Sequence, residues 1–319
     1  MAQVTGQGTI WNLPNYWGNL FTADFLKTPF LTMIGGLTGG GMQTENFEFP
    51  CSSEYDFPAP IQPEITETDS LEAPDATQAI RTQVTNVTQI FHQAVKISYN
   101  KLANRGRLSG VNTAGVINNV ADERAWQIDY NLKIIARNIE HTILNGLYAI
   151  ASNAGVPNKT RGMLEACGLA GGTEIAAVGA ALSKALFDEL LRTMFDAGAM
   201  FMDPVIWCGA YQKGAIDDIY GYAPEDRNVG GINIKQIETS YGLIGVGQLH
   251  PFMPSTAILV ADMSVVRPVT QPTPEKGNFF YEELAKTGAS EDGQIFGMFG
   301  LDHGPAFAHG LISGLDNGT

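Results

Sequence analysis

The chain has 319 residues, 44% of them hydrophobic, which is enough for a sizeable folded core. Its 33 acidic residues outnumber 19 basic ones and give a formal net charge of −14, so it lacks the positive surface needed to bind nucleic acid through phosphates. The cysteines Cys51, Cys167 and Cys208 form no CxxC pair, which argues against a disulfide framework or a zinc site. No apolar run approaches the roughly 18 residues of a membrane span, so we expect a protein made in the cytosol with no membrane contact.

Residues 1–41 are rich in glycine, proline and aromatic side chains, but they show no helical or strand periodicity. This aromatic content makes the segment too apolar for a solvated tail. We therefore expect it to become ordered on another surface. Four of them are candidate contacts with a neighbouring subunit: Trp11, Tyr16, Trp17 and Phe21. The glycine run at residues 35–41 should act as a hinge, because glycine accepts backbone angles closed to other residues.

Residues 42–99 predict two long strands joined by a loop. Alternation at residues 42–49 indicates the first strand, and the threonine-rich, β-branched composition of residues 81–99 indicates the second. The loop at residues 58–78 is proline-rich and contains no lysine or arginine. Its carboxylates are Glu64, Glu67, Asp69, Glu72 and Asp75. Because a loop of roughly 20 residues usually projects or carries function, we expect a hairpin arm with an acidic tip.

The strongest helical signal lies at residues 118–150. Apolar residues recur there at alternating steps of four and three, which places them on one stripe of a helix. They are Ala121, Ala125, Ile128, Leu132, Ile135, Ile139 and Ile143. Asn118 or Asn119 is the expected N-cap. At 1.5 Å per residue this helix would be roughly 50 Å long, so we expect it to be the spine of an extended structure.

Helices and strands alternate in the remainder, which predicts an α+β body. Helices are expected at residues 182–197 and 210–220. Strands are expected at residues 204–208, 232–238, 243–250, 256–261, 264–269, 294–299 and 306–312.

Few side chains are candidates for chemistry. His303 and His309, with Asp302, could be metal ligands, but the glycine and proline between the histidines break any regular register, so packing is the favoured interpretation. Asp217 and Asp218 could form a carboxylate pair, although a solvated helix face is the default for them. The glycine run lacks the lysine that follows a phosphate-binding loop. We therefore predict no catalytic, cofactor or metal site.

Six stretches of the chain resemble one family of tailed-bacteriophage major capsid proteins. They are GTIWNLPNYWGNLFT (8–22), TPFLTMIGGL (28–37), RTQVTNVTQIFHQAVKIS (81–98), DIYGYAPEDRNVGGINIKQIETSYG (218–242), VADMSVVRPV (260–269) and LAKTGASEDGQIFGMFGLDHGP (284–305). The order of predicted segments, from apolar arm through hairpin and long helix to mixed body, is similar to that of the Hong Kong 97-type capsid fold.

This resemblance implies a division into five parts. They are an N-terminal arm (1–41), an extended loop hairpin (42–99), a peripheral domain with a spine helix (100–177), an axial domain (178–260) and a return to the peripheral domain (261–319). It also implies a structural protein that assembles in the host bacterial cytoplasm into hexamers and pentamers of an icosahedral shell. The shell would enclose double-stranded DNA without sequence-specific binding. Portal and scaffolding proteins are implied partners, and a decoration protein is a further candidate.

The acidic loop tip leaves two interpretations open. Basic groups of an adjacent subunit could meet it, the candidates being Arg105, Arg107 and Arg124, or it could simply be solvated. The type member of the fold forms covalent links through a lysine on this loop, but here no lysine lies between Lys27 and Lys96, so such links are not expected.

Two alternatives to a phage capsid remain. An encapsulin-like compartment shell would share the fold and differ in its contents. A soluble α+β enzyme would need a concave pocket with convergent polar groups.

Overall fold

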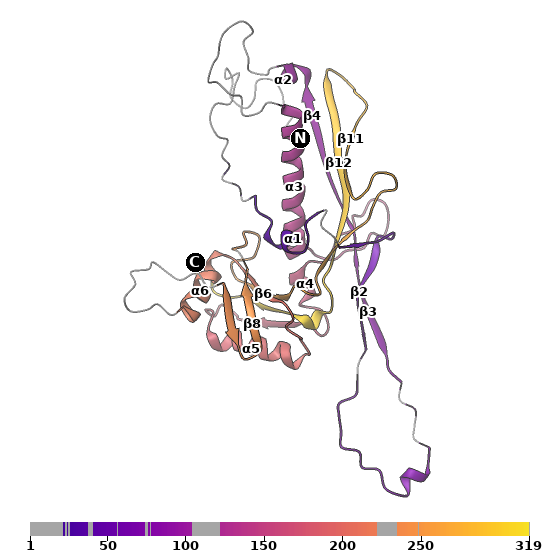
Figure 1. Ribbon diagram of the computed structural model, residues 1–319, viewed down its shortest axis with the longest axis vertical. Coiled ribbons are helices and arrows are strands. Elements are labelled where there is room, and N and C mark those ends of the chain that lie inside the picture. Colours follow the sequence, from indigo (N-terminus) through magenta and orange to yellow (C-terminus); the bar gives the residue numbers. More distant parts are fainter. Residues whose placement is uncertain are drawn as a thin grey trace, which may run out of the picture.

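The computed structural model describes residues 22, 24, 26–37, 41–55, 57–73, 76, 78–103, 122–221, 235–247 and 249–318. A long helix and a long sheet run side by side, and a second sheet with its own helices lies at one end of them (Figure 1). A two-stranded hairpin projects away from both (Figure 1). Within these residues no helix is both long and apolar enough to span a membrane.

A five-stranded sheet is built around the long strand β12 (Ser290–Asp302). β4 (Gln89–Ser98) pairs with β12 antiparallel along its whole length, and β11 (Phe279–Glu283) pairs with the other edge of β12. β10 (Arg267–Thr270) pairs with the far end of β12, and β1 (Met42–Gln43) runs parallel to β10. Because β12 bonds to three strands, it ties the first hundred residues of the chain to the last fifty.

The long helix α3 (Glu123–Asn145) packs along β4 and β12 (Figure 1). Asp122 caps it by accepting hydrogen bonds from the amides of Arg124 and Ala125. The predicted helix over residues 118–150 is therefore too long at its C-terminal end, while residues 118–121, with both asparagine caps, lie outside the described residues. The helix ends at Gly146, where the chain crosses Thr160 so closely that a Cβ would lie 2.5 Å from the Thr160 carbonyl oxygen.

The buried face of α3 follows the predicted stripe only in the second half of the helix. There the isoleucines are buried: Ile135, Ile139 and Ile143. In the first half Ala125 and Leu132 are exposed, and Gln127 and Asn131 are buried instead. A strict spacing of four and three averages 3.5 residues per turn, so the stripe drifts around a straight helix of 3.6 residues per turn. The two buried amides bond within the helix, Gln127 to Glu123 and Asn131 to the Gln127 carbonyl.

A six-stranded sheet forms the second body, in the order β5–β13–β9–β6–β8–β7. Its strands are β5 (Thr173–Ala176), β6 (Pro204–Cys208), β7 (Gln236–Thr239), β8 (Gly242–Val246), β9 (Ile258–Asp262) and β13 (His309–Ser313). Successive residues of a strand face opposite sides. Ile206 belongs to the core formed with α5 (Lys184–Asp196) and α6 (Ala210–Tyr220), whereas Trp207 belongs to the core shared with α3.

The projecting hairpin consists of β2 (Glu48–Tyr55) and β3 (Arg81–Val87), which pair antiparallel. The prediction of one strand over residues 81–99 is wrong, because the strand is interrupted at Thr88. The Thr88 amide donates to the carbonyl of Phe47, and its hydroxyl donates to the Gln271 side chain. β3 therefore belongs to the hairpin and β4 to the long sheet. The predicted strand over residues 42–49 is divided in the same way between β1 and β2.

Five short helices complete the described part of the chain: α1 (Pro29–Met33), η1 (Asp69–Leu71), α2 (Tyr99–Ala103), α4 (Met163–Ala166) and η2 (Ala306–Ala308). The predicted helices at residues 182–197 and 210–220 are confirmed as α5 and α6. The strand predicted at residues 204–208 is confirmed as β6, and the other predicted strands correspond to β7 through β10, β12 and β13 with shifted boundaries, although residues 232–234 lie outside the described part. The sequence did not predict β5 or β11.

Two glycines of β12 lie under aromatic rings of β11. A Cβ on Gly297 would overlap the Phe279 ring, and one on Gly293 would overlap the ring of Tyr281. We predict that Gly297→Ala displaces Phe279 and lowers the free energy of unfolding of the free subunit by about 1–3 kcal/mol. Thermal denaturation measures this loss. Gly288→Ala is the matched control, since no atom lies within 4 Å of the added Cβ. Equal stability of the two variants would contradict this packing.

Candidate functional site

The loop between β2 and β3 exposes apolar side chains that no other described part of the chain covers. Phe57, Ile61, Ile65, Leu71 and Ile80 are each between 71% and 83% exposed. A single exposed apolar residue is ordinary, but several on one unsupported loop mark a surface that contacts another molecule. This loop lies at the far end of the hairpin, away from both bodies (Figure 1).

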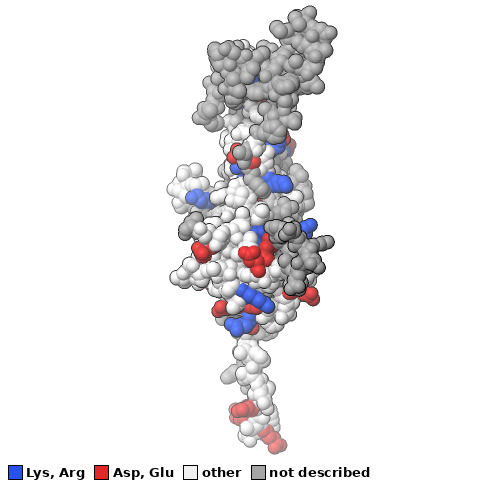
Figure 2. Space-filling model, turned by 90° about the vertical axis from the view of Figure 1, so that its left-hand side faces the viewer, with Lys and Arg blue, Asp and Glu red and all other residues white. Residues whose placement is uncertain are grey.

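The predicted carboxylates lie among these apolar residues. Glu64, Glu67, Asp69 and Glu72 are exposed, and Figure 2 shows acidic groups at the hairpin end with no lysine or arginine beside them. Asp69 accepts hydrogen bonds from the amide and hydroxyl of Thr66 at 3.2 and 2.7 Å, which hold its pKa below the ordinary value. This contact fixes the turn that begins η1. Asp75 lies outside the described residues.

Of the predicted basic partners, only Arg124 falls within the described residues. Its guanidinium pairs with Glu283 and lies 3.7 Å from Glu291, and it sits 5.5 Å from the centre of the Tyr281 ring. Arg124 therefore holds the start of α3 to β11 and β12 of its own chain, and a bond to an adjacent acidic tip would have to compete with these contacts. Arg105 and Arg107 lie outside the described residues, as do the arm residues Trp11, Tyr16, Trp17 and Phe21.

The base of the hairpin is fixed by a fully buried amide, Asn86. Its Nδ2 donates to the carbonyls of Leu301 at 2.7 Å and Arg161 at 3.2 Å. Its Oδ1 accepts from the amides of Arg161 at 2.7 Å and Val87 at 2.9 Å. All four bonds that an asparagine side chain readily makes are present, so this residue locks β3 to β12 and to the loop before α4. The hairpin thus has a rigid base and an uncovered tip.

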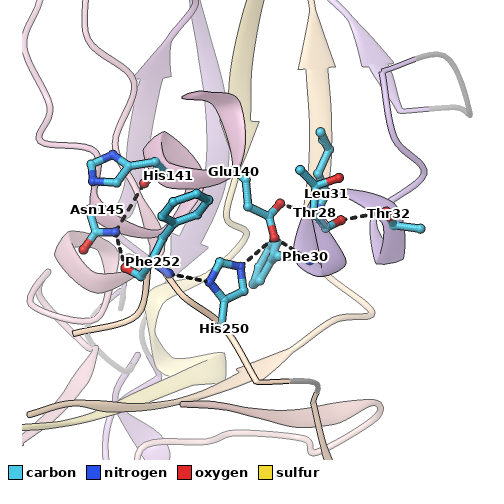
Figure 3. A network of polar contacts seen from close by, with 9 residues as sticks. All are labelled: Thr28, Phe30, Leu31, Thr32, Glu140, His141, Asn145, His250 and Phe252. Carbon is cyan, nitrogen blue, oxygen red and sulfur yellow. Dashed lines mark hydrogen bonds and ion pairs between the residues drawn. The ribbon is translucent and has the colours of Figure 1, made fainter. Parts of the chain in front are cut away.

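A second anchor fixes the N-terminal segment (Figure 3). Glu140 of α3 is fully buried, and its two carboxylate oxygens accept hydrogen bonds from the amides of Phe30 at 2.8 Å and Leu31 at 2.7 Å. These amides belong to the first turn of α1, whose N–H groups have no partner within the helix. A carboxylate at this end is also favoured by the helix dipole. Glu140 therefore supplies the cap that the sequence of α1 lacks.

His250 extends this anchor to the second body (Figure 3). The Phe252 amide donates to its Nδ1 at 3.2 Å, so Nδ1 carries no proton. The proton is then on Nε2, which donates to Glu140 at 2.6 Å. Phe30 packs against Trp207 of β6 with ring centres 4.8 Å apart. Glu140 and His250 thus join α1, α3 and the six-stranded sheet at one buried point.

In the histidine pair noted in the sequence, both ring nitrogens of His309 and the Nδ1 of His303 make hydrogen bonds within the fold. His309 donates from Nε2 to the His303 carbonyl at 2.6 Å, and its Nδ1 accepts from the Asp262 amide at 3.2 Å. Burial lowers the pKa of His303 to about 4, so this imidazole is neutral near pH 7. Within the described residues, no three His, Cys, Asp or Glu side chains gather closely enough to hold a metal ion.

The other candidates for chemistry are two cysteines and the Asp217–Asp218 pair. Burial raises the pKa of Cys51 and of Cys208 to about 12, so neither thiol is an activated nucleophile. Asp217 pairs with Lys213 one helical turn away, and Asp218 is exposed.

Two cavities open within the described part of the chain, one beside α1 and one beside α3. The first, of about 630 Å³, lies between α1 and the six-stranded sheet and is lined mainly by apolar residues and glycine, with Lys27 as its charged group. The second, of about 350 Å³, lies between β4 and α3 and includes His92 and His141. The groups whose pKa values burial shifts, such as His303 and Cys51, line neither cavity.

Comparison with known proteins agrees with this geometry. The SU10 major capsid protein family matches residues 3–316. No curated protein matches the chain. The capsid asymmetric unit of cyanophage A-1(L) superposes with a TM-score of 0.65 at 12% identity, over 95% of this chain and 96% of that one. The capsid of a native GTA particle superposes with a TM-score of 0.57 at 13% identity, over 96% of this chain and 94% of that one.

A compartment protein shares the fold as well. The SrpI encapsulin of Synechococcus elongatus superposes with a TM-score of 0.54 at 11% identity, over 95% of this chain and 94% of that one. At such low identity these superpositions establish the Hong Kong 97-type α+β fold, and the family match goes further. The chain belongs to the SU10 major capsid protein family and is a structural protein of a phage head shell.

Proposed function

We propose that this protein assembles with copies of itself into the hexamers and pentamers of an icosahedral head that encloses the double-stranded DNA of a tailed phage. Assembly takes place in the host bacterial cytoplasm, with portal and scaffolding proteins and a candidate decoration protein as partners. The protein forms the shell around the DNA and has no catalytic role. Its net charge of −14 supports this role, because such a surface does not attract the phosphates of the enclosed DNA.

The observation that carries the proposal is the uncovered hairpin tip. Its apolar residues have no core of their own, although Asn86 holds the base of the hairpin rigidly. Burying a side chain such as Leu71 contributes roughly 1.5–3 kcal/mol. A neighbouring subunit is the partner that an assembling shell supplies, and the aromatic residues of the arm, including Trp11 and Trp17, are proposed to be covered in the same way.

The division of the chain into arm (1–41), extended loop (42–99), peripheral domain (100–177), axial domain (178–260) and return segment (261–319) is part of this proposal. The six-stranded sheet supports an axial body, and α3 with the long sheet supports a peripheral one. β10 and β12, from the return segment, lie in the long sheet, which supports their assignment to the peripheral domain, whereas β4 pairs with β12 although the division counts it in the extended loop.

An encapsulin-like compartment shell is the second candidate, because the encapsulin superposes over nearly the whole chain. The cyanophage capsid superposes more closely, with a TM-score of 0.65 against 0.54. The contents of purified particles separate the two functions, since a phage head holds DNA and a compartment holds protein cargo.

Negative-stain microscopy of the purified protein tests the proposal. We expect closed icosahedral particles, and a protein that stays a small monomer under all assembly conditions would contradict it.

The hairpin tip should be required for assembly. We predict that the triple substitution Ile61→Ser, Ile65→Ser and Leu71→Ser abolishes particle formation, because it removes three apolar groups from the surface that a neighbour covers. The free subunit should keep its melting temperature, since these side chains are exposed there. Sedimentation of assembled particles and thermal denaturation measure the two effects.

A charge variant of the same loop separates apolar contact from ion pairing. In Glu64→Gln, Glu67→Gln and Glu72→Gln the tip loses three charges and keeps its apolar groups. If basic groups of a neighbour meet the tip, shell stability falls at low salt and the difference fades at high salt. A shell whose stability is unchanged at every salt concentration would show a solvated tip. Normal assembly of the triple variant Ile61→Ser, Ile65→Ser and Leu71→Ser would contradict a role of the loop in assembly.

A further inference from the structure

Two apolar residues have backbone angles that disfavour their side chains. Val178 has φ 50° and Phe201 has φ 49°, and Glu275, at 66°, is the third non-glycine residue with positive φ in the described chain. This left-handed region is strained for a β-branched or bulky residue. Such strain persists where the surroundings enforce it and gathers at functional positions.

The turn at Val178 presents this residue to solvent. The Ala180 amide donates to the Ala177 carbonyl at 2.9 Å, and Gly179 also has positive φ, so residues 177–180 form a type I′ turn. Asn-Gly is the preferred pair in such a turn, and valine is poorly suited to the first of these two positions. The amides of Ala177 and Gly179 donate to Ser313 and Gly314, which holds the turn in place. Val178 is nevertheless 89% exposed, so contacts within its own chain do little to offset the strain.

A second exposed apolar surface surrounds the strained backbone at Phe201. Phe201 turns inward against Tyr241, with ring centres 5.8 Å apart, while the methionines on either side of it face solvent. The Asp262 carboxylate accepts hydrogen bonds from the amides of Met202 and Asp203 at 2.8 and 3.1 Å, which fixes this backbone. We call the exposed group the methionine patch: Phe195, Met200, Met202 and Leu243, each between 55% and 71% exposed.

Charge favours contact between these two surfaces on separate copies. Copies of a chain with a net charge of −14 repel one another on average, so contact costs least where both surfaces are neutral. Residues 176–181 (AAVGAA) and residues 197–202 (AGAMFM) carry no charged side chain, although the exposed Asp196 and Asp203 flank the second segment. Depletion of charge and enrichment of methionine and aromatic residues are also typical of interface cores.

The fold places the two surfaces where only different copies can join them. They flank α5, and Val178 follows the end of β5 whereas Met202 precedes the start of β6, a strand parallel to β5. The 13 residues of α5 separate them by about 20 Å. Two different surfaces at opposite ends of one element suit a head-to-tail contact, which closes into a ring when repeated around an axis.

We propose that the turn at Val178 of one subunit packs against the methionine patch of the next subunit in a ring. This inference rests on the proposed function, because it names the contact through which copies of the chain meet around a capsomer axis. The flexible methionine side chains adapt to the single valine, and the strained turn holds that valine outward.

The test separates folding from assembly. Val178→Asn restores the residue that a type I′ turn prefers, so the free subunit should melt at the same temperature or roughly 2 °C higher. Its critical concentration for assembly should rise at least about threefold, because the apolar contact is lost. Glu275→Asn is the matched control, since it relaxes the same backbone strain at a charged, exposed residue. It should leave the critical concentration unchanged, and Val178→Ile should also assemble normally.

Cross-linking identifies the partner surface. Particles of the double variant Val178→Cys and Met202→Cys, treated with a short bis-maleimide, should give a ladder of covalent multimers on a denaturing gel. Each single variant and the wild type should give monomers, because Cys167 and Cys208 are buried and burial raises the pKa of Cys51 to about 12. If Val178→Asn assembles like wild type and the double variant gives no ladder, this inference falls while the proposed function stands. If the wild type forms no particles, both fall.

Discussion

Replacing Asn86 with alanine is expected to lower the free energy of unfolding by about 3 kcal/mol or more. The change leaves two carbonyls and two amides of the hairpin base without the side chain that bonds to them. These groups lie around a fully buried residue, so water cannot easily replace the lost bonds. Denaturant unfolding of the free subunit measures the loss, and hydrogen exchange locates it at the amides of Arg161 and Val87.

Two further variants make this prediction specific. Asn86→Asp keeps the size of the side chain but turns an oxygen toward the carbonyls of Arg161 and Leu301, so we expect a loss at least as large. Asn138→Ala removes an exposed asparagine from α3 and should leave stability nearly unchanged. If Asn86→Asp were as stable as wild type, packing and not hydrogen bonding would hold the hairpin base.

Features that arise from local patterns could be predicted from the sequence. Alternation and β-branched residues indicated the hairpin, and the isoleucines Ile135, Ile139 and Ile143 indicated the spine helix, because both signals depend on neighbouring residues. The exposed acidic tip was likewise visible in a loop with prolines and no basic residue. These local signals were sufficient for the α+β class.

Features that depend on distant residues could not be predicted. Thr88 divides the predicted strand because it bonds to Gln271, 183 residues away. Asn86 lies among other polar residues in RTQVTNVTQ (81–89), so nothing marked it as buried, and its partner Leu301 is 215 residues away. Glu140 and His250 lie 110 residues apart, and nothing in the local sequence of either indicated a buried pair.

Both anchors connect the body to the segments that we propose contact neighbouring subunits. Asn86 holds the hairpin and Glu140 holds α1, in the C-terminal part of the arm. A shell subunit must keep such extensions in fixed directions, because each has to meet a neighbour at a defined place. The buried polar groups fix the direction of each extension, because hydrogen bonds require a strict geometry. Apolar packing around them imposes no such geometry.

Glu140→Ala is expected to release α1 from α3. The substitution removes the acceptor of three buried hydrogen bonds, from Phe30, Leu31 and His250, and leaves all three donors without a partner. Bonds to a carboxylate are stronger than neutral ones, so we expect a loss of about 3 kcal/mol or more in the docking of this segment. Glu140→Gln should lie between alanine and wild type, because its amide keeps one acceptor oxygen and turns an N–H group toward a donor.

Hydrogen exchange of the Glu140 variants distinguishes release of α1 from general unfolding. The amides of Phe30 and Leu31 should lose protection in Glu140→Ala, while β9 in the second body stays protected, because it bonds to β6 and β13 and not to α1. Glu189→Gln, at an exposed position of α5, is the matched control and should behave like wild type. Fewer particles should form from the alanine variant, since the arm would leave the body in no fixed direction. Full protection of Phe30 and Leu31 in that variant would show that the contact of Phe30 with Trp207 suffices to hold α1, and that Glu140 is not its anchor.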